Sequence, residues 1–344
     1  MTKENFLTST ARITARITGR ITGLGAYLPE RILTNSDLEQ MVDTTHEWIF
    51  TRSGIEERRI AAPDEFSSTM GTKAAQKALQ YANLQPADVD AIIVSSMTPD
   101  YLCPSTAALI QHELGAKKAC AIDIQAACSG FLYGLSIAKA WVESGTFQNI
   151  LLIATEKNSA FVDYQDRSTC VLFGDGAGAA VIQKNGSGYS IDHVCLGADG
   201  EQSNLIVIPA SGCRVPASQE TIQARQHFLK MNGKEVFKHA VRQMESAAKE
   251  CLEKTGVSQE AISWMVPHQA NVRIMEAIAK RFDVPWERVF RTIQKYGNTS
   301  SSTVPIALAE LDMEKMPKEH EKLLLFAFGG GLTWGAALLT KTLQ

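Results

Sequence analysis

The sequence predicts an α/β protein with buried, largely parallel sheets built from two related halves. Short β-type apolar runs alternate with longer helical patterns, which is typical of sheets covered by helices. The halves also resemble each other, because residues 173–180 and 328–337 both read as a strand end, a glycine turn and a second apolar strand. Residues 92–97 and 262–268 likewise each lead a buried strand into a polar loop. A chain of 344 residues is long enough for such a duplicated fold.

The individual elements follow from local periodicity in chain order. Apolar β-type runs predict strands at 91–96, 119–124, 150–154, 171–173, 179–183, 264–267 and 323–328. Helical patterns cover 68–82, 104–114, 129–144, 233–255, 271–282 and 301–313. The uncharged stretch 323–340 has the length of a membrane helix, but the glycines in its middle favour two buried strands joined by a loop.

The chain divides into four segments. Residues 1–19 form an N-terminal extension expected to be flexible, 20–196 the first half, 197–219 a polar Gly/Ser-rich connection, and 220–344 the second half. The extension repeats Ala-Arg-Ile-Thr and has no acidic residue between Glu4 and Glu30, which is typical of an organelle transit peptide. The alternative is a plain extension whose last copy, Arg20–Thr22, begins the first strand.

Composition excludes several classes of protein. Lys plus Arg number 34 and Asp plus Glu 37, so the net charge of −3 gives no global attraction to nucleic acid or to an anionic membrane. The seven cysteines contain no CxxC pair, which argues against a disulfide framework or a zinc ribbon and fits a reducing cytoplasm. The seven histidines form no HExxH motif, so no metal site is expected.

Cys128 is the candidate nucleophile because of its position. It follows Ala126-Ala127 at an expected strand end and precedes a helix that is apolar nearly all round. A thiol in the first turn of a helix lies near unpaired backbone N–H groups and the positive end of the dipole, which favour the thiolate. The other six cysteines are interpreted as small buried hydrophobes.

His268 and Asn298 are the candidate partners of this thiol. Each stands after a strand or loop and before a helix, where site residues gather in α/β folds. Taken alone, His268 could equally be a hydrogen-bonded residue of the core. The Gly297-Asn298 pair could equally be an ordinary turn. The spacings of 140 residues from Cys128 to His268 and 30 from His268 to Asn298 fit any Cys/His/Asn site.

Five motifs together resemble those of β-ketoacyl-[acyl-carrier-protein] synthase III, the initiating condensing enzyme of type II fatty acid synthesis. They are Ala127–Gly130, Phe173–Gly178, Pro267–Asn271, Gly297–Ser300 and Phe328–Gly331. The similarity runs from about Ile21 to the carboxyl end, and an asparagine at 298 differs from the elongating synthases, which use two histidines. The resemblance implies a thiolase-like fold of five layers, α-β-α-β-α, from two duplicated halves, usually as a homodimer.

The resemblance also implies a mechanism. Cys128 takes an acyl group from acyl-CoA, and malonyl on acyl carrier protein then loses CO2 and attacks the acyl-cysteine, with ping-pong kinetics. The N–H groups of Cys128 and Gly330 form an oxyanion hole, while His268 and Asn298 donate to the malonyl thioester oxygen. Phe173 packs beside the nucleophile. No permanently bound cofactor and no metal are implied, and the CoA thioester and phosphopantetheine-linked malonyl are substrates.

The same resemblance places CoA and the carrier protein. Trp48 and Arg167 sandwich the adenine, Arg52 holds phosphate and Asn271 bonds the pantetheine arm. Independently, Lys234, Lys238 and Arg242 recur at i, i+4 and i+8 and form a basic helix stripe suited to an acidic carrier, although a solvated helix face explains it equally well. The carrier-binding residues expected are Gln269, Ala270, Asn271, Val272, Arg273, Lys238, Lys280 and Arg281.

Cys103 is where the chain departs from the family. It lies on a loop, 99–105, that in relatives reaches across the dimer to close the acyl pocket, and an aromatic residue commonly stands at this position. The smaller side chain leads to the hypothesis that primers longer than acetyl-CoA, or branched ones, are accepted.

Three other functions remain open at the level of sequence. One is a thiolase-fold synthase with a CoA-linked extender, of the 3-ketoacyl-CoA or polyketide type. The others are a papain-like Cys/His/Asn hydrolase and a dimeric scaffold with an inert cysteine. The expected location is cytoplasmic, or plastid if the N-terminal tract is a transit remnant.

Overall fold

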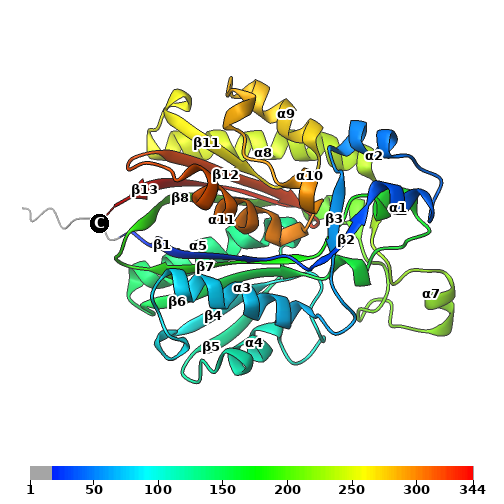
Figure 1. Ribbon diagram of the computed structural model, residues 1–344, viewed down its shortest axis with the longest axis horizontal. Coiled ribbons are helices and arrows are strands. Elements are labelled where there is room, and N and C mark those ends of the chain that lie inside the picture. The colour runs from blue at the N-terminus through cyan, green and yellow to red at the C-terminus, as the bar shows by residue number, and fades with distance from the viewer. Residues whose placement is uncertain (1–17, 344) are drawn as a thin grey trace, which may run out of the picture.

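In the computed structural model, which describes residues 18–343, nine strands of this part of the chain form one hydrogen-bonded sheet (Figure 1). Their order is β11-β12-β13-β8-β1-β7-β6-β4-β5. The strands are β1 (Arg20–Tyr27), β4 (Ala91–Ser95), β5 (Cys120–Ile124), β6 (Asn149–Glu156), β7 (Gly176–Gln183), β8 (Gly188–Ala198), β11 (Ile262–Pro267), β12 (Lys322–Gly329) and β13 (Thr333–Thr342). Two short antiparallel pairs are separate: β2 (Arg31–Thr34) with β3 (Glu57–Ile60), and β9 (Ile206–Val207) with β10 (Lys230–Met231).

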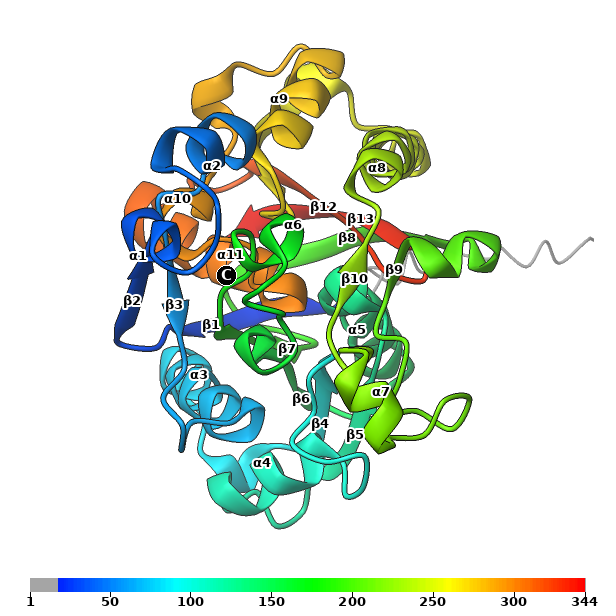
Figure 2. The ribbon, with the colours of Figure 1, turned by 90° about the vertical axis from the view of Figure 1, so that its right-hand side faces the viewer.

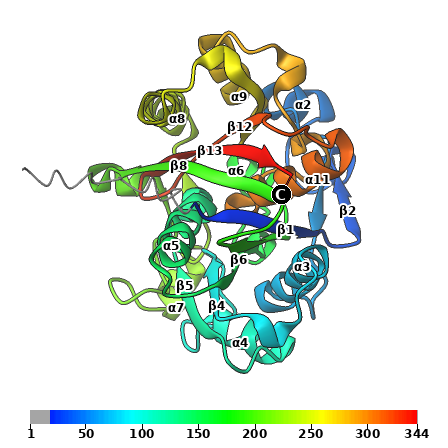
Figure 3. The same ribbon diagram turned by 90° about the vertical axis from the view of Figure 1, so that its left-hand side faces the viewer.

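The strand pairing of the first half is repeated in the second. β4 is parallel to β6, which is followed by the antiparallel strands β7 and β1. In the same way β11 is parallel to β12, which is followed by the antiparallel strands β13 and β8. The first half adds β5, parallel to β4 at the sheet edge. The halves join where β1 pairs with β8, and Figure 3 shows β8 lying between β13 and β1.

Six longer helices pack on the nine-stranded sheet, both on its outside and between its two halves (Figures 1 and 2). Helices α3 (Ser67–Tyr81) and α4 (Thr106–Leu114) cover the first-half strands on the outside, and α8 (Gly233–Thr255) and α9 (Val272–Arg281) cover those of the second half. Helices α5 (Gly130–Ser144) and α11 (Thr303–Lys315) lie between the two sets of strands. Short helices are α1 (Asn35–Glu39), α2 (His46–Ser53), α6 (Arg167–Cys170), α7 (Gln219–Gln223) and α10 (Ile293–Tyr296).

Alternation along the strands explains this layering. Ile93, Leu152 and Ile182 pack in the central cluster with α5 and α11, whereas their neighbours Ile92, Leu151 and Val181 pack with α3 and α4. In β12 the residues Leu323 and Leu325 face the centre, and Leu324 and Phe326 face α8 and α9. Both faces of β4, β6, β7 and β12 are buried, so these strands are largely apolar, whereas the edge strand β5 and the strand β8 are partly exposed and carry polar residues. The result is the predicted order of five layers, α-β-α-β-α.

Most predicted elements match, but the prediction of largely parallel sheets is wrong, because β1 with β7 and β8, β6 with β7, and β13 with β8 and β12 are antiparallel pairs. The predicted strand 171–173 is wrong. Helix α6 ends at Cys170, and in the segment after it Phe173 forms an isolated β-bridge with Asn298 instead of a strand. The elements not predicted are the strand β8, the short strands β2, β3, β9 and β10, and the short helices α1, α2, α6, α7 and α10. The uncharged run 323–340 forms β12 and β13, and among the described residues no helix is long and apolar enough to span a membrane. The extension 1–17, with most of the Arg-Ile-Thr repeat, lies outside the described residues, while Arg20–Thr22 begins β1.

Candidate active site

Cys128 lies in a 3-10 turn, Ala127–Ser129, between β5 and α5. Ala127 has φ +44°, so the chain turns sharply just before the thiol. Glycine is required on both sides of it. A Cβ on Gly130 would lie 1.8 Å from Ser95 Oγ, and one on Gly329 would lie 2.6 Å from Cys128 N. The backbone of Cys128 therefore packs closely against Gly329, at the end of β12 in the other half.

The Cys128 thiol is a neutral group in this structure. Its residue is 9% exposed, and Sγ lies 3.5 Å from Ser300 Oγ. Burial raises the pKa of Cys128 to about 12, aided by the negative charge of Glu156 and opposed by the Ser300 hydroxyl. The expectation that the helix terminus leaves a thiolate is therefore wrong, because desolvation outweighs the backbone N–H groups.

His268 follows directly after β11, where its N–H donates to Phe326 O at 2.8 Å. Its Nδ1 lies 2.7 Å from Thr303 Oγ1, at the start of α11. Burial lowers the pKa of His268 to about 3, so the imidazole is neutral at physiological pH. The ring is thereby fixed as a neutral hydrogen-bonding group, and Nε2 is the nitrogen not tied to Thr303.

Asn298 is fixed by its backbone and by its own side chain. Its N–H donates to Leu172 O at 2.8 Å, and its carbonyl accepts from Gly174 N at 3.1 Å. Asn298 Oδ1 accepts from Ser300 N at 2.8 Å. A backbone N–H can only donate, so this bond defines the amide orientation. The Nδ2 group is then the part of the side chain left to donate to another molecule.

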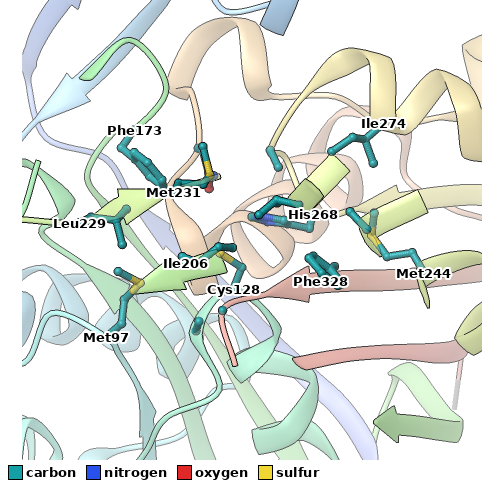
Figure 4. A pocket seen from close by; sticks show the side chains of 16 residues that line it. Met97, Cys128, Phe173, Ile206, Leu229, Met231, Met244, His268, Ile274 and Phe328 are labelled. Carbon is teal, nitrogen blue, oxygen red and sulfur yellow. The ribbon is translucent and has the colours of Figure 1, made fainter. Parts of the chain in front are cut away.

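Cys128, His268 and Asn298 line one small cavity (Figure 4). Most of its other walls are apolar, and Figure 4 shows methionine, leucine, isoleucine and phenylalanine side chains around the thiol and the imidazole. Gly330, the predicted second oxyanion donor, and Phe173, the predicted pocket residue, also line it. Ile206 of β9 and Met231 of β10 close one side, so the predicted connection 197–219 contributes a wall of the site.

A second, larger cavity adjoins the first. Both are lined by Met231, Val236, Ala270, Ile274 and Asn298, so they meet at these residues. The outer cavity is bounded by the predicted CoA residues Trp48, Arg52 and Asn271, and by Lys234 and Arg273. An apolar inner chamber thus opens into a wider space with cationic walls.

Two arginine side chains make cation–π contacts with the Trp48 ring. Arg52 Cζ lies 4.4 Å from the ring centroid and Arg167 Cζ 4.9 Å. Arg167 also donates to Asp43 O at 2.8 Å. An adenine ring between Trp48 and Arg167 therefore requires this arginine to move outward. Asn271 caps α9 through Oδ1, which accepts from Arg273 N, and its Nδ2 remains available.

Two predicted contact residues, Gln269 and Cys103, lie outside the walls of the inner cavity. Gln269 is 1% exposed, and its amide donates to Pro267 O and Phe290 O while accepting from Thr292 N and Ile293 N. It is committed to holding loops together and cannot contact a carrier protein, so that prediction is wrong. Cys103 is exposed and does not line the cavity of its own chain. Its expected role across a dimer stays a prediction.

The other predicted carrier-binding residues occupy two adjacent helices and the entrance between them. Ala270 lines both cavities, and Val272 is partly buried. Arg273, Lys280 and Arg281 are exposed on α9, and Lys238 is exposed on α8. Lys238 pairs with Glu235, and Arg281 pairs with Glu245 across the two helices.

Three buried polar residues around Cys128 were not predicted as functional. Ser300 and Thr303 follow the Gly-Asn motif and are 0% and 1% exposed, with Ser300 at φ +55°. Glu156 is 0% exposed at the end of β6. The run of hydroxyl residues after Asn298 was the sequence signal that could have identified Ser300 and Thr303. No such signal pointed to Glu156, which appears in the sequence as a single carboxylate at the end of an apolar strand.

The fold and this chamber define a thiolase-type condensing enzyme. Among the described residues no group of His, Cys, Asp or Glu could hold a metal. Residues 122–200 match the family model of 3-oxoacyl-[acyl-carrier-protein (ACP)] synthase III, and residues 252–341 match its C-terminal model.

Known proteins establish the family. The chain is 57% identical over 318 residues to β-ketoacyl-[acyl-carrier-protein] synthase III of Chlamydia caviae, covering 92% of this chain and 95% of the relative. The crystal structure of 3-oxoacyl-[acyl-carrier-protein] synthase III from Aquifex aeolicus superposes with a TM-score of 0.87 at 48% identity, covering 94% and 99% of the two chains. The enzyme of Thermus thermophilus gives 0.86 at 45% identity, with coverage of 94% and 99%.

The chain therefore belongs to the β-ketoacyl-[acyl-carrier-protein] synthase III family. It is an acyltransferase-type condensing enzyme that initiates fatty acid synthesis, as predicted. The alternatives of a papain-like hydrolase and an inert scaffold are excluded by this membership, and a CoA-linked extender is not favoured.

Proposed function

We propose that the enzyme acylates Cys128 from a short acyl-CoA and condenses the acyl group with malonyl-[acyl carrier protein]. The products are 3-oxoacyl-[acyl carrier protein], CoA and CO2. The observation that carries the proposal is the pair of connected cavities. The inner one brings thiol, imidazole and carboxamide together, and the outer one offers Trp48, Arg52 and Lys234 to a nucleotide-bearing thioester.

The catalytic roles follow from the hydrogen-bonding capacity of each group. Cys128 is the nucleophile, and its own N–H with that of Gly330 receives the oxyanion of the acylation step. Asn298 Nδ2 and His268 Nε2 donate to the malonyl thioester oxygen as the enolate forms. This role places the imidazole proton on Nε2, so the Thr303 hydroxyl must turn its one proton from Ser300 O, 3.0 Å away, to His268 Nδ1, 2.7 Å away. Apolar walls exclude water and protect the carbanion.

The primer is a short or branched acyl group. The inner cavity is lined by flexible methionines, Met97 and Met244 among them, which adapt to different shapes. Cys103 completes this pocket from a partner subunit in a homodimer. Residues of α8 and α9, including Lys234 and Arg273, bind the acidic carrier protein. No resident cofactor takes part, and the enzyme works in the cytoplasm.

Intact-protein mass spectrometry tests the proposal in one series. The wild-type protein is incubated with acetyl-, isobutyryl- or octanoyl-CoA, and each accepted primer adds the mass of its acyl group. The Cys128→Ala variant, with Cys251→Ala as a buried-cysteine control, locates the adduct. A wild-type mass that does not change with any primer contradicts the proposal. Labelling by acetyl-CoA alone refutes only the wider primer range.

A further inference from the structure

Ser300 is hydrogen-bonded toward each of the three groups that carry the proposed chemistry. Its Oγ lies 3.5 Å from Cys128 Sγ, and its N–H donates to Asn298 Oδ1 at 2.8 Å. Its carbonyl accepts from Thr303 Oγ1 at 3.0 Å, and the same threonine hydroxyl lies 2.7 Å from His268 Nδ1. The backbone of Ser300 is thus tied to Asn298 and Thr303, whereas its side chain contacts the reacting sulfur.

The backbone conformation at Ser300 does not by itself call for a serine. The residue has φ +55°, which is uncommon for residues with a Cβ and which glycine adopts at little cost. Its N–H and carbonyl bonds involve backbone atoms only on the side of Ser300, so a glycine could make them equally well. Residues held in such sparsely populated conformations cluster at functional sites. What a glycine would lack is the hydroxyl that contacts Cys128 Sγ.

The direction of the bond between Ser300 and Cys128 depends on the charge of the sulfur. A hydroxyl and a neutral thiol can each donate and accept, but a thiolate only accepts. While Sγ carries charge, the proton of the Ser300 hydroxyl must therefore point to it. Ser300 is 0% exposed and lies outside the lining of the inner cavity, so a bound acyl group does not take its place. Burial raises the pKa of Cys128, and the Ser300 hydroxyl is the strongest of the influences that lower it.

We infer that Ser300 is a further catalytic residue, whose hydroxyl donates a hydrogen bond to Cys128 Sγ whenever that sulfur carries negative charge. In acylation Sγ forms a bond to the acyl carbon, the bond from this carbon to the CoA sulfur breaks, and the net balance moves one proton from the Cys128 thiol to CoA. In condensation the C–S bond to Cys128 breaks, and Sγ leaves as a thiolate that takes a proton from water. Ser300 keeps its own proton in both steps. Its hydrogen bond stabilises the sulfur first as nucleophile and then as leaving group.

The inference rests on the proposed acylation of Cys128, and two variants without the hydroxyl test it. Ser300→Gly accepts φ +55° readily, whereas Ser300→Ala adds backbone strain to the loss of the hydroxyl. We expect both variants to release CoA from acetyl-CoA about 10-fold more slowly than wild type in a single turnover, the size of one hydrogen bond to a charged atom. The matched control is Ser302→Ala, whose equally buried hydroxyl bonds Thr299 O, and it should acylate at the wild-type rate.

Two further measurements on Ser300→Gly separate the effect of the hydroxyl on the sulfur from damage to the whole site. Alkylation of Cys128 by iodoacetamide at pH 8, followed by peptide mass spectrometry, needs neither substrate and should slow about 10-fold. Decarboxylation of malonyl-carrier protein by the free enzyme builds charge on oxygen instead of sulfur. Its rate should stay within a few-fold of wild type.

The outcomes distinguish the inference from the proposed function. Wild-type rates of acylation and alkylation in Ser300→Gly overturn the inference, because the hydroxyl would then not act on the sulfur. Equal losses of acylation and decarboxylation in Ser300→Gly also overturn it, because the site as a whole would be disturbed. A wild-type enzyme that acetyl-CoA does not acylate refutes the proposed function instead, and the alkylation rates still decide whether Ser300 donates to the sulfur.

Discussion

The depressed pKa of His268 makes a measurable prediction about stability. Its ordinary value of 6.5 falls to about 3 on folding because the ring is buried. Between these values the unfolded chain binds a proton that the folded chain does not, so stability due to this group is complete above pH 6.5 and is lost as the pH falls toward 3. Acidification from pH 7.5 to 5.0 should therefore cost about 2 kcal/mol through His268 alone.

Glu156 has the opposite effect in the same pH range. Its pKa rises from 4.5 to about 7 on folding, so protonation between these values favours the folded state. The same acidification should return about 2 kcal/mol, which nearly cancels the His268 loss in the wild type. The His268→Asn variant removes one side of this balance and leaves the other.

Urea unfolding at pH 7.5 and 5.0 separates the two contributions. We expect the variant to gain about 2 kcal/mol of unfolding free energy relative to wild type when the pH falls from 7.5 to 5.0, whatever its stability at pH 7.5. His193→Asn, at a partly buried position in β8 outside the cavity, is the control. Equal pH dependence in wild type and His268→Asn would mean that the imidazole titrates normally, and the argument that it is a neutral donor would fall.

Three further results are expected from the site. Asn298→Ala removes a donor to the enolate, so decarboxylation of malonyl-carrier protein should fall by about 10²- to 10³-fold in single-turnover assays while CoA release in the acylation step changes little; equal losses in both steps would contradict this division. Gly329→Ala places a Cβ 2.6 Å from Cys128 N and should slow acylation by about 10²-fold, whereas Gly200→Ala, where nothing lies within 4 Å, should not; similar rates in the two variants would show that the close approach is unimportant. Reversing charge in Lys234→Glu with Arg273→Glu should raise KM for malonyl-carrier protein about tenfold at low salt and less at high salt, and a salt-independent effect would argue against an electrostatic carrier surface.

Periodicity predicted buried sheets covered by helices because most core strands are apolar on both faces, whereas the order of five layers was implied by the family resemblance. The helix over 233–255 agrees to the residue, since Asn232 caps it and Gly256 ends it in a left-handed conformation. The strand predicted at 171–173 was wrong because three apolar residues can equally follow a short helix. Their path is determined by pairing with the distant residue Asn298. The strand β8 was missed because its alternation includes Asp192 and His193.

The site was predictable where motifs carried it and not where burial decided the chemistry. Cys128, His268 and Asn298 do share one cavity. The charge state of the thiol was predicted wrongly, because helix-terminus arguments ignore desolvation, which depends on the whole surrounding fold. Gln269 has the sequence position of an entrance residue, yet its amide satisfies four backbone groups of neighbouring loops. Sequence order places a residue near an entrance but does not say which way its side chain turns.

Burial also gives a reason for the order of the two substrates. Malonyl brings a carboxylate into a chamber whose apolar walls penalise a second negative charge. Before acylation the charge of Glu156 already raises the pKa of Cys128, so it also opposes an incoming anion. The uncharged acyl end of a primer thioester enters such a chamber at a lower cost than malonyl does, which favours the order of substrates in a ping-pong condensation.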